Sequence, residues 1–109
     1  MCSGKIYYEL LERQQTENRK DIAIVRLEQL YPMPLNQLNE LYAKYEGAEF
    51  CWVQEEPKNM GAWLFLLRWD NNLRLKRISR ESSASPATGY SKVHAEEQKS
   101  IIDRAFTLA

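Results

Sequence analysis

The sequence predicts an α/β protein, specifically a three-layer α/β/α sandwich with a mainly parallel sheet. Two short segments, residues 22–27 and 50–54, are almost continuously apolar, which is typical of strands covered on both faces. Segments whose apolar residues recur at helical spacing follow and separate them. Strand and helix therefore alternate along 109 residues, which is enough chain for one domain with one core.

The first half of the chain contains two predicted helices and one strand. The first helix is expected to open at the turn of residues 3–5 and to fade into the polar stretch 14–20. Its buried face is predicted to hold Ile6, Tyr7, Leu10 and Leu11. After strand 22–27, Pro34 suits the first turn of a second helix and Gly47 its end. The buried face of that helix is predicted to hold Leu35, Leu38, Leu41, Tyr42 and Tyr45.

In the second half, strand 50–54 is predicted to stop at Glu55 and Glu56, because Pro57 cannot donate a further ladder hydrogen bond. A mostly apolar helix is expected from about residue 62 to about residue 70. Residues 73–78 alternate like a weaker edge strand. A loop rich in Ser, Ala, Pro and Gly, 79–89, precedes the last helix. Its apolar face is predicted to hold Tyr90, Val93, Ile101, Ile102, Ala105 and Phe106.

Composition and charge argue against several classes of partner. Fifteen basic and fifteen acidic residues cancel, so no overall field draws the chain to nucleic acid or to a membrane surface. No apolar run approaches the ~20 residues of a membrane helix. Cys2 and Cys51 lack metal-ligand spacing, and we expect reduced, buried thiols of a cytosolic protein. Trp52, Trp63 and Trp69 are expected in the core or an interface.

Four blocks of sequence, in order and over essentially the whole chain, resemble one known family. They are residues 2–10 (CSGKIYYEL), 21–32 (DIAIVRLEQLYP), 50–63 (FCWVQEEPKNMGAW) and 80–94 (RESSASPATGYSKVH). The chain is similar to the C-terminal domain of the thiamine-diphosphate-dependent, decarboxylating component of 2-oxoglutarate dehydrogenase. This domain has the transketolase C-terminal fold, with a five-stranded sheet. Ser79 departs from the pattern, since many relatives carry glycine there.

The resemblance implies a function for a longer protein. Such a protein decarboxylates 2-oxoglutarate on thiamine diphosphate and Mg²⁺, and passes succinyl to the lipoyl arm of the succinyltransferase component in the tricarboxylic acid cycle. Both cofactors bind to upstream domains at a homodimer interface. We therefore expect no catalytic residue, cofactor or metal site in these residues, and no activity of the chain alone.

The implied partners are the upstream domains, the second subunit and the succinyltransferase. The expected location is the cytoplasm of a bacterium or the mitochondrial matrix of a eukaryote. The 2-oxoadipate-using homologue is an alternative, because substrate choice is made upstream.

The resemblance also implies an incomplete sheet, lacking its first strand and most of its second. Where relatives have an edge strand and most of a central strand, this chain has only Met1 and Cys2. The central strand would lie between strands 22–27 and 50–54. Their edges would lose backbone partners, at ~1–3 kcal/mol for each unsatisfied buried group. We expect another copy to close the gap, or else a shortened chain of marginal stability.

The carboxyl end of the sheet is the candidate interface, because α/β folds gather polar groups there. Glu55 and Glu56 are adjacent on a strand and point in opposite directions, which suits an interdomain or subunit contact, or simple solvation, better than acid–base catalysis. The resemblance suggests that Arg80 ties the loop 83–89 to this rim, against Glu55 or Glu56. His94, next to Val93 on the apolar face, is expected to be packed or hydrogen-bonded. The candidate interface residues are Glu55, Glu56, Asn59, Trp63, Arg80 and His94.

The turn formed by Ser3, Gly4 and Lys5 is a candidate site for an effector anion, because free amides at a helix start favour negative charge. It lacks the several glycines of a phosphate-binding loop. An alternative function of another class is a stand-alone interaction or regulatory module that binds an adenine nucleotide or acyl-CoA at the carboxyl end of the sheet. The basic run Arg74, Lys76, Arg77 and Arg80 fits a solvated edge strand.

Overall fold

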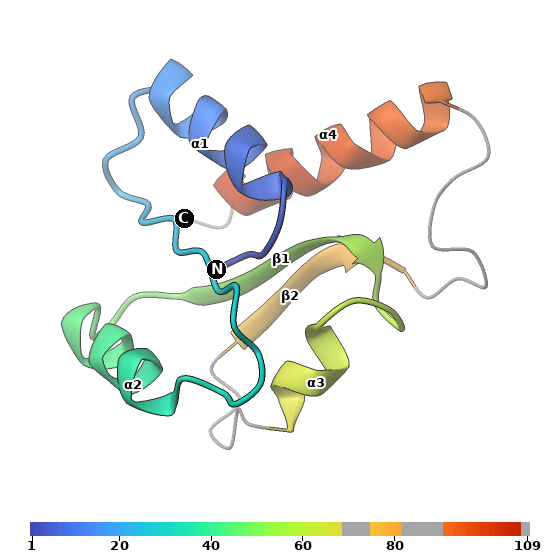
Figure 1. Cartoon of the computed structure of the whole chain (residues 1–109). Coiled ribbons are helices and arrows are strands. Elements are labelled where there is room, and N and C mark those ends of the chain that lie inside the picture. Colours follow the sequence, from blue (N-terminus) through green and yellow to red (C-terminus); the bar gives the residue numbers. More distant parts are fainter. Residues whose placement is uncertain (69–74, 82–90, 108–109) are drawn as a thin grey trace.

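The computed structural model describes residues 1–68, 75–81 and 91–107. The elements in chain order are α1 (Ile6–Thr16), α2 (Leu35–Lys44), β1 (Phe50–Pro57), α3 (Trp63–Leu67), β2 (Leu75–Arg80) and α4 (Ser91–Thr107). β1 and β2 are parallel neighbours, with α1 and α4 on one face and α2 and α3 on the other (Figure 1). The predicted α/β class is confirmed. Trp69, Arg74, Tyr90 and the loop 83–89 lie outside the described residues.

β1 is longer than predicted. Its regular register runs from Phe50 opposite Leu75 to Val53 opposite Ile78, and pairing resumes at Pro57 opposite Arg80. Three β1 residues therefore face one β2 residue in between, as in a bulge. The prediction that the strand stops before Pro57 was wrong. The amide of Lys58 takes up the bond that Pro57 cannot make, and donates to the Arg80 carbonyl at 2.9 Å.

The predicted strand at residues 22–27 was also wrong: this segment contains only an isolated bridge, from Arg26 to Cys2. The segment does form main-chain hydrogen bonds with residue 2 on the edge that faces β1. Cys2 donates to the Val25 carbonyl at 3.0 Å and accepts from Leu27 at 2.8 Å, while the Met1 carbonyl accepts from Val53 of β1 at 2.9 Å. Residues 1–2 thus lie between the segment and β1, where the central strand was expected. Two residues are too few to build a ladder, so no strand forms.

Hydrophobic residues form one cluster on each face of the sheet. Trp52 and Val53 are consecutive on β1 and point to opposite faces, as the period of a strand requires. The first cluster joins β1 and β2 to α1 and α4, through Cys2, Ile6, Leu10, Val53, Ile78, Ile101, Ile102 and Phe106. The second joins the sheet to α2 and α3, through Leu27, Met33, Leu38, Trp52, Trp63, Leu66 and Leu75.

Most predicted helix faces agree with this core, with three corrections. Leu35 is exposed, because the chain already places Met33 in the core before α2 begins. Val93 is 40% exposed, because the first turns of α4 extend away from the sheet (Figure 1). α3 ends at Leu67, earlier than expected. Among the described residues no helix is long and apolar enough to cross a membrane.

Candidate interface at the carboxyl end of the sheet

Gln54 organises the loop that leaves β1. Its side chain is buried, and Oε1 accepts from the indole Nε1–H of Trp52 at 2.9 Å and from the amide of Trp63 at 3.1 Å. Its Nε2 donates to the carbonyls of Pro57 and Met60, both at 2.9 Å, and of Glu56 at 3.1 Å. A buried amide whose groups are all bonded holds the loop in one shape. The sequence analysis did not identify this role of Gln54. One feature could have indicated it: Gln54 is the polar residue that ends an apolar run just before a loop with a proline.

Gly61 closes the same loop. Its φ is +67°, in the left-handed region that glycine adopts without strain. A Cβ there would lie 3.0 Å from Glu56 Oε2 and 3.1 Å from Gln54 Oε1. The loop therefore requires glycine both for its backbone conformation and for the space beside Gln54.

Glu55 joins three elements at the end of the sheet. Its side chain is 18% exposed, and Oε1 accepts from Gln98 of α4 at 3.1 Å and lies 3.5 Å from Lys5 Nζ at the start of α1. Glu56, the next residue, is exposed. The two carboxylates thus differ in environment. Gln98 of α4, which holds Glu55, was not singled out from the sequence.

Arg80, the last residue of β2, links the strands to α4. Its guanidinium lies 3.3 Å from the carboxylate of Glu97, and its Nε donates to the main-chain carbonyl of Glu55 at 3.3 Å. The expected tie between Arg80 and the end of β1 is present, but this bond goes to the carbonyl of Glu55 and not to a carboxylate. The loop 83–89, which Arg80 was also expected to hold, lies outside the described residues.

The other predicted rim residues are dispersed. Trp63 is buried in the α2–α3 cluster, and its amide donates to Gln54 at the rim. Asn59 is exposed on the loop. His94 is exposed on α4, so the prediction that it packs on the apolar face was wrong, for the same reason as for Val93. The alternative of a hydrogen-bonded histidine stays a prediction.

The turn of residues 3–5 does bind an anion, but one that belongs to the chain. The Gly4 amide donates to Glu28 Oε1 at 3.1 Å and the Ser3 hydroxyl to Glu28 Oε2 at 3.2 Å. Arg26 forms an ion pair with the same carboxylate at 3.1 Å. The Gly4 amide first, and then Arg26, hold the pKa of Glu28 below its ordinary value. Lys5 points instead to Glu55.

Neither cysteine is in a disulfide, as expected. Cys2 is fully buried and Cys51 only half-buried. Burial raises the pKa of both thiols. In the described part of the chain, no group of three or more His, Cys, Asp or Glu side chains is placed to hold a metal ion.

Comparison with known proteins identifies the family of the chain. A family model described as 2-oxoglutarate dehydrogenase C-terminal matches residues 1–106. The chain belongs to this family. The 2-oxoglutarate dehydrogenase E1 component of Azotobacter vinelandii is 44% identical over 117 residues, covering 99% of this chain and 12% of the relative. The oxoglutarate dehydrogenase of Buchnera aphidicola is 44% identical over 115 residues, covering 100% of the chain and 13% of the relative. The multifunctional 2-oxoglutarate metabolism enzyme of Mycobacterium sp. (strain JLS) is 50% identical over 113 residues, covering 97% of this chain and 9% of the relative.

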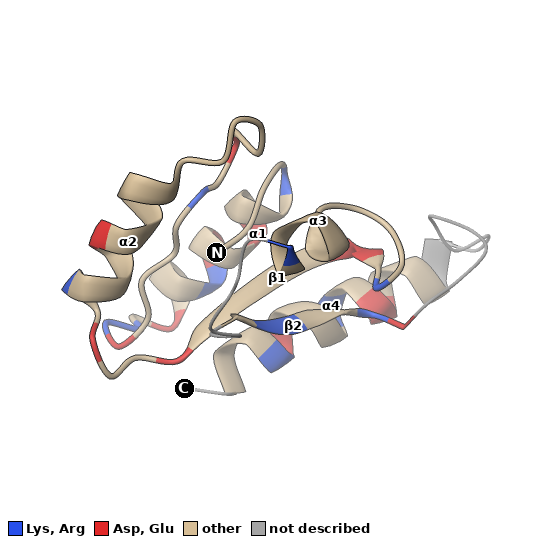
Figure 2. Cartoon of the chain, turned by 90° about the horizontal axis from the view of Figure 1, so that it is seen from below, with Lys and Arg blue, Asp and Glu red and all other residues tan. Residues whose placement is uncertain are grey.

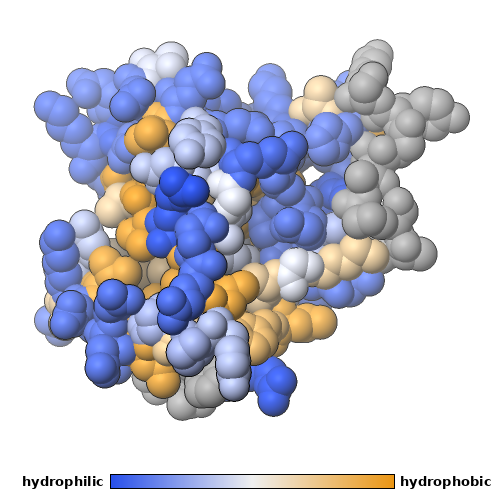
Figure 3. Space-filling view, in the orientation of Figure 1, coloured by the Kyte–Doolittle hydropathy of each residue, from blue (hydrophilic) through white to orange (hydrophobic). Residues whose placement is uncertain are grey.

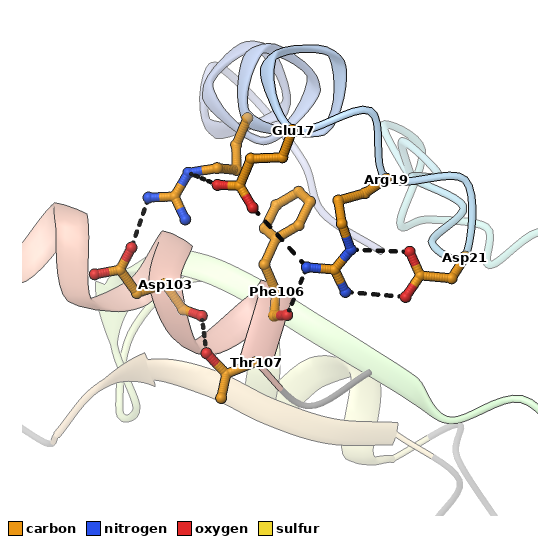
Figure 4. Close-up of polar contacts among 7 residues, drawn as sticks. Glu17, Arg19, Asp21, Asp103, Phe106 and Thr107 are labelled. Carbon is orange, nitrogen blue, oxygen red and sulfur yellow. Dashed lines mark hydrogen bonds and ion pairs between the residues drawn. The ribbon is translucent and has the colours of Figure 1, made fainter.

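In this member of the 2-oxoglutarate dehydrogenase C-terminal family, a second polar cluster joins α1 to α4 at the opposite end of the sheet. Arg13 bonds Asp103 at 2.6 Å, and Arg19 binds Asp21 through two bonds of 2.9 Å. Figure 4 shows Phe106 next to Arg19, whose guanidinium donates to the Phe106 carbonyl at 3.1 Å. The cluster fixes the end of α1 on the end of α4.

The polar groups at the rim stabilise structure and can meet a partner. Acidic and basic positions are interspersed along the described chain and not sorted by sign (Figure 2). Gln54 is buried and bonded within its own loop, and the partly buried Glu55 and Arg80 are bonded to each other and to α4. Glu56 and Asn59 are exposed beside them. Such a mixed polar surface over a rigid loop is typical of contacts between domains of one chain.

Proposed function

We propose that the chain serves as the C-terminal structural and interface domain of a 2-oxoglutarate dehydrogenase. The observation that carries the proposal is the match of residues 1–106 to the C-terminal family model, together with a chain that spans only 12% of the Azotobacter relative. The longer enzyme would decarboxylate 2-oxoglutarate and pass succinyl to lipoyl. Thiamine diphosphate and Mg²⁺ would be held by its upstream domains, and no chemical step is assigned to residues of this chain.

In this proposal the two described strands belong to a larger parallel sheet of the transketolase C-terminal type, with three layers. Two features support it: helix pairs cover opposite faces of the sheet, and residues 1–2 lie between residues 25–27 and β1. The named relatives come from bacteria, which favours the cytoplasm as location.

The rim would dock on the upstream domains or on the second subunit. Gln54 holds the loop after β1, and Glu55 and Arg80 lock the strand ends to α1 and α4. The exposed Glu56 and Asn59 on this rigid support would contact the partner. The succinyltransferase component would bind the assembled enzyme.

A chimera tests the proposal. Residues 1–109 replace the matching part of the Azotobacter enzyme, and the dimer is followed by sedimentation and 2-oxoglutarate turnover by product formation. We expect a dimer that turns over 2-oxoglutarate, and no turnover by the chain alone with thiamine diphosphate and Mg²⁺. Glu56→Ala with Asn59→Ala should weaken the dimer or the domain contact, whereas Glu12→Ala, an exposed position on α1, should not. Turnover by the isolated chain, or a folded chimera that neither dimerises nor reacts, overturns the proposal.

A regulatory module that binds an adenine nucleotide or acyl-CoA is the rival function. It has less support, because the donors of Ser3 and Gly4 already bind Glu28. Calorimetry with AMP and acetyl-CoA separates the two: heat of binding that is lost in Lys5→Ala favours the module. The 2-oxoadipate-using homologue remains a rival for substrate, whereas the printed names of the relatives refer to 2-oxoglutarate.

A further inference from the structure

The end of β1 and the loop that follows it carry two opposite charges that the chain does not pair. Glu56 and Lys58 are both exposed, on either side of the buried Pro57. Among the described residues, no hydrogen bond or ion pair reaches the Glu56 carboxylate or the Lys58 ammonium, and the two do not pair with each other. The neighbouring Glu55, by contrast, is paired with Lys5. A free anion and a free cation therefore stand close together at the end of the sheet (Figure 1).

Both charges stand on a backbone that is already fixed. Gln54 holds the loop from inside, through bonds to two of its carbonyls. The Lys58 amide donates to the last carbonyl of β2 at 2.9 Å. The Glu56 side chain lies against Gly61, where a Cβ would come within 3.2 Å of Glu56 Cβ. Groups that are held in place lose less conformational entropy on binding, so this loop is prepared for a partner.

The arrangement of the two charges is complementary to itself. In a twofold contact, residue i of one subunit meets residue j of the other, and j meets i. Two copies of this loop that cross in opposite directions, with Pro57 at the axis, would place each Glu56 opposite Lys58 of the partner subunit. The two ion pairs would lie ~6.6 Å apart, at ~3.3 Å for each extended residue. Because residues 56–61 carry no net charge, a partner of one sign is not favoured.

Apolar surface lies next to the two charges. α3 begins at Trp63, directly after the loop, and Leu64 in its first turn is 51% exposed. Figure 3 shows hydrophobic side chains gathered over α3. Ion pairs at a surface add little affinity but fix the register and exclude wrong partners, whereas apolar burial supplies attraction. Both components are present beside the loop.

We propose that this loop binds the same loop of a second copy across a twofold axis, with Glu56 of each copy paired to Lys58 of the partner subunit. The inference rests on the proposed function, in which the rim contacts the upstream domains or the second subunit. It selects the second subunit, and within that subunit the same rim.

Zero-length cross-linking tests the contact directly. A chain with Lys58→Gln keeps only the carboxylate, and a chain with Glu56→Gln keeps only the ammonium, so a carbodiimide can join residues 56 and 58 only between chains. The two variants are mixed, both in the chimera with the Azotobacter enzyme and as the chain alone. We expect the link in digests of the mixture and not in those of either variant. Lys44→Gln mixed with Glu40→Gln, both exposed on α2, is the matched control and should give no link.

Exchange of the charges tests the symmetry. Glu56→Lys or Lys58→Glu alone would place like charges opposite each other, and should weaken the dimer of the chimera about tenfold or more in sedimentation. Both changes together restore complementarity, and should return the dissociation constant to within about threefold of the unaltered chimera. Glu40→Lys on α2 should change it less than about twofold. The losses should shrink in 1 M salt, because these charges are exposed.

Rescue by the double change would not occur if these charges met any other surface. In a chimera that is dimeric and turns over 2-oxoglutarate, lack of rescue or lack of the link overturns this inference and leaves the proposed function standing. If the chimera neither dimerises nor reacts, the proposed function fails. The link between isolated chains then decides the inference: its presence supports the twofold contact, and its absence overturns it.

Discussion

The side-chain oxygen of Gln54 accepts the main-chain amide of Trp63 at 3.1 Å, across a loop of eight residues that the same side chain also holds by its nitrogen. Substitution of Gln54 by Leu keeps the volume and removes every bond. The Trp52 indole N–H and the Trp63 amide would be left buried without a partner. We expect the free energy of unfolding to fall by about 2–4 kcal/mol. Chemical denaturation measures it.

Gln37→Leu is the matched control for that change. Gln37 is exposed on α2, so the same substitution should alter stability by less than about 0.5 kcal/mol. Equal effects of the two substitutions would contradict the role of Gln54.

Gly61 and Gly47 separate backbone strain from lack of space. Both have positive φ, +67° and +86°, but a Cβ at Gly47 would meet nothing within 4 Å, whereas at Gly61 it would press on Gln54 and Glu56. We expect Gly47→Ala to cost about 1 kcal/mol of stability, from strain alone. Gly61→Ala should cost about 2 kcal/mol or more. Thermal unfolding of the two variants checks the order, and a larger loss at Gly47 would be inconsistent with the described loop.

Glu28 makes stability depend on pH. Its pKa is lowered in the folded chain, so its contribution is present above the ordinary glutamate pKa of about 4.3 and is lost as the pH falls through the lower folded value. Glu28→Gln should therefore be less stable than the natural sequence at pH 7, and the difference should vanish in acid. Unfolding curves from pH 7 to pH 2 measure this. A difference that stays constant over that range would exclude the proposed linkage.

The two thiols should differ in reactivity. Cys2 is completely buried, whereas Cys51, the second residue of β1, is only half-buried. Burial raises both pKa values, so little thiolate is present at neutral pH. We expect iodoacetamide to modify Cys51 slowly and Cys2 more slowly still, as mass spectrometry of digests would show. Faster modification of Cys2 would place the N-terminus outside the sheet.

The helices and β1 were predictable because their information is local. The apolar period of α1 identified Ile6 and Leu10, and that of α4 identified Ile101, Ile102 and Phe106, all of which are buried. The segment 22–27 shows the limit of such reasoning. Its composition is that of a buried strand, but a strand exists only where a neighbour supplies a ladder, and here residues 1–2 supply one bridge.

The candidate site was predicted in place but not in detail. The position of the rim followed from the end of an apolar run, and Glu55 and Arg80 do meet there. Their partners on α4, Glu97 and Gln98, are distant in sequence and carry no local pattern. Glu28 likewise reaches the turn of residues 3–5 from 24 residues away. Contacts of this kind depend on the fold and not on the composition of either segment.

At the contact between α1 and α4, the contributions of an ion pair and of apolar burial to the free energy of unfolding can be measured separately. Arg13 and Asp103 form the shortest of the described bonds between the two helices, at 2.6 Å, but both side chains are partly solvated. We expect the coupling in an Arg13→Ala, Asp103→Ala double-mutant cycle to be below about 1 kcal/mol and to shrink in 1 M salt. Ile101, fully buried between the helices and the sheet, should cost about 2–5 kcal/mol when changed to Ala, independently of salt. A coupling larger than the cost of Ile101→Ala would mean that the ion pair and not the apolar cluster holds these helices together.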